Sequence, residues 1–262
     1  MSWELLQQVR LIDPSTAMDQ VVDLLIQSGQ VTAIAPTITD YPAETQVTDC
    51  TGNILAPGLV DLYSHSGEPG FEARETLASL YQGAIAGGFH HLALLPDTDP
   101  AVDQPGQVNW LRDRWQALHT NDSPQITLHL WGAMTQNAQG EQLSELADLA
   151  ATGVVGWADS RAKASLSLIR RLLEYCQSSP RPLLLWPCDR GLVGSGIARE
   201  GIDATRLGLP GDPAISETTV VASVLECAAR WETPIHLMRI STARSVELIE
   251  QAKARGLPVT AS

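Results

Sequence analysis

The sequence has little positive charge and few cysteines. Only two of its 262 residues are lysine, and the formal net charge at pH 7 is −13, with a pI of about 4.8. Nucleic acid and anionic membranes bind basic surfaces, so this charge balance argues against both as partners. The four cysteines are widely spaced and form no CxxC pair. They indicate buried thiols in a reducing compartment, not a disulfide framework or a zinc ribbon.

Long hydrophobic segments are also missing. The first ten residues, "MSWELLQQVR", contain no apolar core of a signal peptide, and no run of eighteen apolar residues follows. No GxGxxG motif follows a predicted strand, so nucleotide binding of that kind has no support. Glycine and proline are spread between apolar runs, which is typical of a folded chain. We therefore expect a globular, cytoplasmic protein.

The chain changes its pattern near residue 57. Residues 1–56 read as short strands, with a hairpin turn at Ser28-Gly29. Beyond them, strands alternate with helices, which predicts an α/β fold with a parallel sheet and right-handed crossovers. Seven strands can be counted, and an eight-stranded barrel is their natural closure, with an open doubly wound sheet as the alternative. The predicted strands are "GLVDLY", "FHHLALLP", "ITLHLWGAM", "VVGWAD", "PLLLWPCD", "PIHLMRIS" and "LPVTAS".

Several segments together resemble the dihydroorotase branch of the amidohydrolase superfamily: "APGLVDLYSHSGEPG", "LLPDTDPAVDQP", "ATRLGLPGDPAISE" and "HLMRISTARSVELIEQAKARGLPVTAS". The resemblance implies a metal-bearing (β/α)8 TIM-type barrel beside a small β-sandwich built from both termini. Residues 1–56 would then be the N-terminal part of the sandwich, and residues 57–262 an incomplete barrel with strands 1–7 only. It also implies the reversible cyclisation of carbamoyl-aspartate to dihydroorotate, with one or two zinc ions.

The first half of the barrel departs from that family. Its strand 1 normally carries a His-x-His pair of ligands, whereas this chain reads Tyr63-Ser64-His65 and keeps one histidine. The family's arginine that grips the substrate carboxylate corresponds to Gly67. A substrate-binding asparagine after strand 2 corresponds to Asp97, whose charge would repel a dicarboxylate. The resemblance therefore implies a weakened substrate site.

The second half departs further. The bridging aspartate after strand 4 corresponds to Asp159, and a carboxylated lysine cannot replace it, because neither Lys163 nor Lys253 lies on a predicted strand. The histidine after strand 5 corresponds to Pro187, which has no donor atom. The histidine of strand 6 corresponds to Arg239, which has no lone pair for a cation.

The family's catalytic aspartate after strand 8 would lie beyond Ser262 and is the sixth expected metal or acid/base position. Two of the six keep a suitable group, His65 and Asp159, and two ligands do not hold a catalytic zinc. We predict a vestigial site without a cofactor; a zinc ion held by these two residues and other groups is the alternative. We also predict that Arg239 points into the barrel mouth and neutralises carboxylates there. Asp159 is the first candidate, and Asp189 and Asp97 are further ones.

Other chemically active side chains have structural interpretations. His129 lies in the middle of a predicted strand and is expected in the core. His236 is expected to face the helices, since two-residue alternation places it opposite Arg239. Trp157 and Trp186 lie near the carboxyl ends of strands. They fill the former cavity or pack between strands and helices, and the sequence does not choose between these.

Three functions follow from the resemblance. The first is a non-catalytic dihydroorotase-like protein that serves as a structural partner of aspartate transcarbamoylase, as some members of this family do. The second is an active amidohydrolase with an altered substrate range and one metal. The third is a sensor that keeps the pocket without the chemistry. Since strands 1 and 7 would have unpaired edges, we expect an oligomer or completion by other polypeptide.

Overall fold

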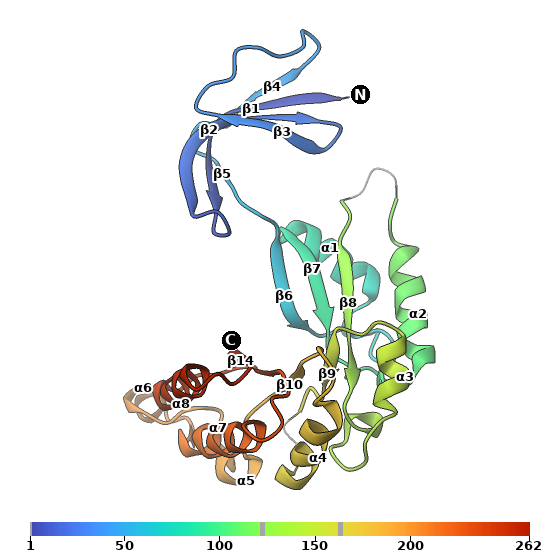
Figure 1. Ribbon diagram of the computed structural model, residues 1–262, viewed down its shortest axis with the longest axis vertical. Helices are drawn as coiled ribbons and strands as arrows, with labels where there is room; N and C mark the ends of the chain where they lie inside the picture. The colour runs from blue at the N-terminus through green and yellow to red at the C-terminus, as the bar shows by residue number, and fades with distance from the viewer. Residues whose placement is uncertain (1, 121–123, 162–164) are drawn as a thin grey trace. The chain divides into compact units, whose positions relative to one another are not determined.

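The computed structural model describes residues 2–120, 124–161 and 165–262, so Lys163 lies outside the described residues. The chain forms two compact units, Met1–Leu59 and Val60–Ser262 (Figure 1). The boundary expected after residue 56 lies three residues before this division. In the described part, no helix has the length and apolar character needed to cross a bilayer.

The first unit is a five-stranded sheet in which β1 pairs antiparallel with β2 and parallel with β4 and β5. The predicted hairpin joins β2 to β3 through Ser28 and Gly29, both at positive φ (50° and 80°), as such tight turns require. The buried carboxylate of Asp23 accepts hydrogen bonds from the backbone N–H groups of Gln8 and Ile38, both at 2.9 Å. The strands are β1 (Trp3–Asp13), β2 (Met18–Gln27), β3 (Gln30–Ala35), β4 (Gln46–Asp49) and β5 (Ile54–Leu55).

The second unit contains a curled sheet that forms an incomplete (β/α)8 TIM-type barrel (Figure 1). Seven strands appear within the described residues, and each corresponds to a strand predicted from the sequence. Their order is β14-β13-β10-β9-β8-β7-β6, so β6 and β14 form the edges of this sheet. The strands are β6 (Leu59–Ser64), β7 (Phe89–Leu94), β8 (Thr127–Ala133), β9 (Gly156–Ala158), β10 (Leu183–Leu185), β13 (Ile235–Leu237) and β14 (Val259–Ala261).

Helices connect these strands, and hydroxyl side chains begin three of them. Thr76, Ser165 and Thr242 each accept a hydrogen bond from the backbone N–H three residues later, which satisfies a donor that the helix itself leaves unpaired. The connecting helices are α1 (Leu77–Ala86), α2 (Pro105–Gln116), α3 (Leu146–Ala151), α4 (Leu166–Cys176), α7 (Ile215–Ala228) and α8 (Ala243–Ala254), with a 3-10 turn, η1 (Gln136–Ala138).

Alternation along the strands divides the sheet into two faces. Leu183 and Leu185 pack in the large core between sheet and helices, whereas Leu184 between them packs on the concave inner face. Trp131 of β8 also lies on the inner face, and its indole N–H donates to the backbone carbonyl of Leu62 on β6 at 2.8 Å. The inner face is thus filled with side chains near its centre.

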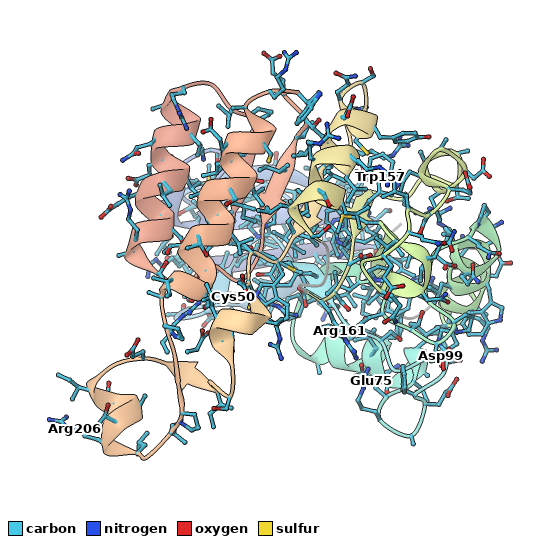
Figure 2. All side chains as sticks on the ribbon, turned by 90° about the horizontal axis from the view of Figure 1, so that it is seen from below. Cys50, Glu75, Asp99, Trp157, Arg161 and Arg206 are labelled. Atoms are coloured by element: carbon cyan, nitrogen blue, oxygen red, sulfur yellow. The ribbon has the colours of Figure 1, made fainter. Side chains whose placement is uncertain are left out.

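An excursion interrupts the strand–helix pattern between β10 and α7. Sequence periodicity did not predict it, because elements of two to five residues are too short to show a period. Figure 2 shows Arg206 on an arm that extends away from the other helices. The excursion contains α5 (Arg190–Val193), β11 (Ala198–Arg199), α6 (Ile202–Arg206) and β12 (Gly211–Asp212), with β11 and β12 paired in parallel.

The carboxylate of Glu217 anchors this excursion to the start of α8. Glu217 is 2% exposed and accepts hydrogen bonds from the backbone and hydroxyl groups of Ser241 and Thr242. The guanidinium of Arg199 donates to it at 2.5 Å and also bonds Asp212 at 3.0 Å. Burial would raise the pKa of Glu217, but the hydroxyl and N–H donors outweigh it and lower the pKa to about 2.

Candidate functional site

The carboxyl ends of four strands bring four side chains together. His65 follows β6, Asp97 follows β7, Trp186 follows β10 and Arg239 follows β13. We call Asp97, His65, Arg239 and Trp186 the central cluster. Active sites of TIM-type barrels lie at this end of the strands, so the cluster occupies the position where chemistry would be expected.

A chain of polar contacts runs through the central cluster. Nδ1 of His65 lies 2.7 Å from Oδ2 of Asp97, and Nε2 lies 3.2 Å from Nη2 of Arg239. A guanidinium can only donate, so Nε2 of His65 accepts, and Nδ1–H donates to Asp97. The guanidinium carbon also lies 4.5 Å from the centre of the Trp186 ring. Arg239 therefore reaches Asp97 through His65.

The backbone of Arg239 adopts a conformation that non-glycine residues rarely use. Its φ is 62°, in the left-handed region, which costs about 1–2 kcal/mol for a residue with a side chain. The contacts with His65 and Trp186 hold the side chain of Arg239 in this position. Such strain persists where surrounding contacts over-determine a residue.

Tyr63 takes part in a second set of hydrogen bonds. Its hydroxyl lies 3.0 Å from Oγ of Ser262, just after β14, and this oxygen lies 2.9 Å from Nε2 of His236. Nδ1 of His236 lies 2.8 Å from Oγ1 of Thr260. These hydrogen bonds link side chains from β6, β13 and β14. Burial of the His236 imidazole disfavours its charged form and lowers its pKa.

The expectation that His236 faces the helices was wrong. Ile235 and Leu237 on either side of it pack in the core between sheet and helices, so His236 faces inward, in register with Leu184. Two-residue alternation does not extend from Arg239 to His236. Arg239 lies beyond the end of β13, where positive φ turns the backbone and breaks the two-residue period.

Asp159 and Asp189, both proposed as partners of Arg239, accept hydrogen bonds from other groups. Asp159 is buried and accepts from the backbone N–H groups of Met134 and Thr135, at 3.1 and 3.2 Å, and from the Thr135 hydroxyl at 2.6 Å. Asp189 accepts two backbone N–H groups as the N-cap of α5. Asp159 thus ties the end of β9 to the loop after β8.

The two remaining positions offer no ligand atoms. At Gly67 an added Cβ would lie 2.3 Å from the carbonyl oxygen of Glu75 and 2.7 Å from that of Phe71. Both are backbone atoms, so no side chain fits there without movement of the loop. Pro187 is buried and lines a cavity between α4 and α7.

These residues do not fit a catalytic zinc site. Arg239 takes the Nε2 lone pair of His65 that a metal would need. Oδ1 of Asp97 is buried without a hydrogen-bond partner, and one oxygen does not make a metal site. Across residues 2–120, 124–161 and 165–262, no group of three or more histidine, cysteine, aspartate or glutamate side chains could hold a metal ion.

Two further histidines pair with each other, and two tryptophans predicted near strand ends lie in different places. Nδ1 of His91 lies 3.1 Å from Nε2 of His129, whose pKa is lowered by burial and by His91. Trp157 packs in the core between sheet and helices, whereas Trp186 lies in the central cluster. The sequence signalled neither the cation–π contact nor the Tyr63 network, since both join strands distant along the chain.

The chain matches known proteins along most of its length. The family model "Dihydro-orotase-like" matches residues 52–243. A "Probable dihydroorotase-like protein" of Synechocystis sp. is 44% identical over 271 residues, covering 97% of this chain and 62% of that protein. A dihydroorotase of Pelobacter propionicus is 34% identical, covering 98% and 59%.

The fold also has solved counterparts. An L-hydantoinase (dihydropyrimidinase) from Arthrobacter aurescens superimposes with a TM-score of 0.77 at 17% identity, covering 100% of this chain and 58% of that one. The chain thus spans about three-fifths of the length of the curated relatives that it matches. Since the family model covers well over half of the sequence, the chain belongs to the dihydroorotase-like family.

Proposed function

We propose that this chain belongs to a dihydroorotase-like protein of pyrimidine biosynthesis whose amidohydrolase centre is not catalytic, and that the protein acts as a structural or regulatory partner of aspartate transcarbamoylase. The family membership supports the pathway. The state of the central cluster supports the loss of catalysis, and the surface of the second unit supports a partner.

The contact between Arg239 and His65 carries the first part of the proposal. A metal ligand must present a lone pair, and the imidazole has one, on Nε2 once Nδ1–H donates to Asp97. Arg239 occupies that lone pair with a permanent positive charge. A divalent cation would therefore have to displace a guanidinium that is also stacked on Trp186.

Substrate binding is weakened independently of the metal. An arginine at position 67 would be required to grip a substrate carboxylate as in the resembled family, but backbone oxygens of Glu75 and Phe71 close that space. The carboxylate of Asp97 adds negative charge at the same mouth. A dicarboxylate such as carbamoyl-aspartate would meet repulsion there in place of a cationic clamp.

The exposed apolar side chains of the excursion support a protein partner. Large exposed apolar patches on soluble proteins mark interaction sites, and the excursion exposes several large apolar side chains. The net charge of −13 would favour a partner with a basic face, chiefly by accelerating the encounter. The large apolar side chains exposed in the excursion are Leu192, Ile197, Ile202, Leu207 and Leu209, and Ile215 at the start of α7 is exposed as well.

Metal content and turnover test the first part. The purified protein should contain no stoichiometric zinc, and added zinc should not produce interconversion of carbamoyl-aspartate and dihydroorotate. Zinc-dependent turnover would establish instead the active amidohydrolase with a reduced metal site.

Sizing with and without aspartate transcarbamoylase from the same host tests the second part. We expect co-elution at micromolar concentration, with a stable interface of at least about 1,000 Å². Independent elution, with unchanged transcarbamoylase activity, would contradict the partner.

A further inference from the structure

A cavity of about 470 Å³ opens between the start of α4 and the middle of α7. Its floor is apolar and buried, formed by Ile169, Leu185 and Val224. Trp186 forms one wall, and Leu166 lies at the mouth with 46% of its surface exposed. His65 and Arg239 do not line it, so it is separate from the central cluster although both share Trp186.

The rim of this cavity carries positive charge. Arg161 and Arg190 both line it and are exposed, and neither forms an ion pair with a carboxylate within the part of the chain that the structure describes. The two carboxylates that also line it, Asp159 and Asp189, already accept two or more hydrogen bonds each. The guanidinium groups are therefore the charges available to a ligand.

The hydroxyl groups on the α7 side are already committed as donors. Thr219 donates to the carbonyl of Ile215, and Ser223 donates to the carbonyl of Thr219. Each hydroxyl oxygen therefore offers only lone pairs to a ligand, and it can accept a hydrogen bond from a neutral donor group. An anion offers no donor and would be directed to the arginine side of the rim.

We propose that this cavity binds a small organic anion with a flat apolar body of one or two rings and a single carboxylate or phosphate group. Its volume is about three times that of the roughly 150 Å³ cavity known to admit benzene, and it falls within the usual range of ligand pockets. The rings lie against Trp186 and the apolar floor, and the anionic group meets Arg161 and Arg190.

Calorimetric titration with cinnamate and with its neutral isostere cinnamamide tests the charge requirement. Cinnamate should bind about fivefold or more tightly than cinnamamide, since only the carboxylate forms charge-assisted hydrogen bonds. Phenyl phosphate distinguishes a phosphate from a carboxylate preference. Arg161→Ala and Arg190→Ala should each weaken cinnamate by about threefold. Arg170→Ala removes an exposed arginine of α4 that does not line the cavity, and it should leave cinnamate binding unchanged.

Filling the cavity tests its location. Ser223→Phe should abolish cinnamate binding, whereas Ala222→Phe, at the neighbouring exposed position of α7, should leave it unchanged. Circular dichroism verifies that both variants fold. In the unmodified protein, cinnamate should slow the alkylation of Cys188, which lines the cavity, relative to Cys227, which does not. Peptide mass spectrometry resolves the two.

The proposed loss of catalysis is tested separately. Zinc content and dihydroorotate turnover decide that proposal, whereas cinnamate binding decides this one, so either can fail without the other. Equal affinity for cinnamate and cinnamamide, no binding of either at millimolar concentration, or undiminished binding by a folded Ser223→Phe protein would each overturn the assignment.

Discussion

Nη2 of Arg239 lies 3.2 Å from Nε2 of His65, across 174 residues of sequence. His65 follows the edge strand β6, and Arg239 follows β13, next to the other edge of the same sheet. The contact therefore crosses the open mouth of the incomplete barrel. It joins the ends of β6 and β13 by a hydrogen bond from the guanidinium to the imidazole.

Restoring one histidine should not restore a metal centre. In the Tyr63→His protein, position 187 remains proline and Arg239 still occupies Nε2 of His65. We expect no zinc-dependent turnover and no stoichiometric zinc by elemental analysis. Measurable zinc-dependent conversion of dihydroorotate by this variant would contradict the interpretation of the central cluster.

The left-handed backbone at Arg239 predicts an unusual order of stability. Arg239→Gly and Arg239→Ala both lose the contacts with His65 and Trp186, but glycine adopts φ of 62° without steric cost. The glycine variant should therefore be more stable than the alanine variant by about 1 kcal/mol. Urea denaturation of both proteins measures the difference, and a more stable alanine variant would show that the backbone at this position is relaxed.

Replacing the buried carboxylate of Glu217 should be costly. Glu217→Gln keeps the shape but turns one acceptor into a donor that faces Arg199, Ser241 and Thr242. We expect a loss of about 3 kcal/mol in the free energy of unfolding. Glu226→Gln, at an exposed position of the same helix, is the matched control and should change it by less than about 0.5 kcal/mol.

The lowered pKa of Glu217 should make the stability of the fold sensitive to acid. The pKa of Glu217 is lowered from its ordinary value of 4.5 to about 2, so its contribution is fully present above pH 4.5 and is lost as the pH falls towards 2. The shift corresponds to about 3 kcal/mol. Denaturation between pH 5 and 2.5 should show a steeper loss of stability for the natural protein than for Glu217→Gln, and parallel curves would refute this.

His236 should remain neutral in mildly acidic solution. Burial lowers its pKa below the ordinary value of 6.5, so its stabilising contribution is present above pH 6.5 and declines as the pH falls through its folded pKa. Nuclear magnetic resonance of the imidazole protons should give a midpoint below the ordinary value of 6.5. A midpoint at or above 6.5 would mean that Thr260 and Ser262 stabilise the charged ring.

The strands, helices and family could be predicted from the sequence because their signals are local. The apolar alternation around Leu183–Leu185 and the serine that begins α4 act within a few residues. The excursion around Arg199 could not be predicted, because its elements are too short for periodicity. The orientation of His236 was missed, since a backbone turn after β13 shifts the count.

The partners of Arg239 were beyond prediction for another reason. Arg239 reaches the barrel mouth because it follows β13 and the positive φ there turns the backbone. The choice among Asp159, Asp189, Asp97 and an imidazole depends on packing. Asp159 is held by the loop after β8, and Asp189 caps α5. These local hydrogen bonds decide the outcome, and no short-range pattern in the sequence encodes them.

The hydrogen bond from Trp131 to Leu62 gives the molecule a built-in optical reporter. It joins β8 directly to the edge strand β6 and passes over β7, so the indole senses whether the edge is in place. If β6 loosens, the indole N–H exchanges its carbonyl partner for water, and the surroundings of the ring become more polar. The fluorescence emission of Trp131, isolated by replacing the other tryptophans with phenylalanine, would then shift to longer wavelength. The shift would report the detachment of β6 from the sheet in real time.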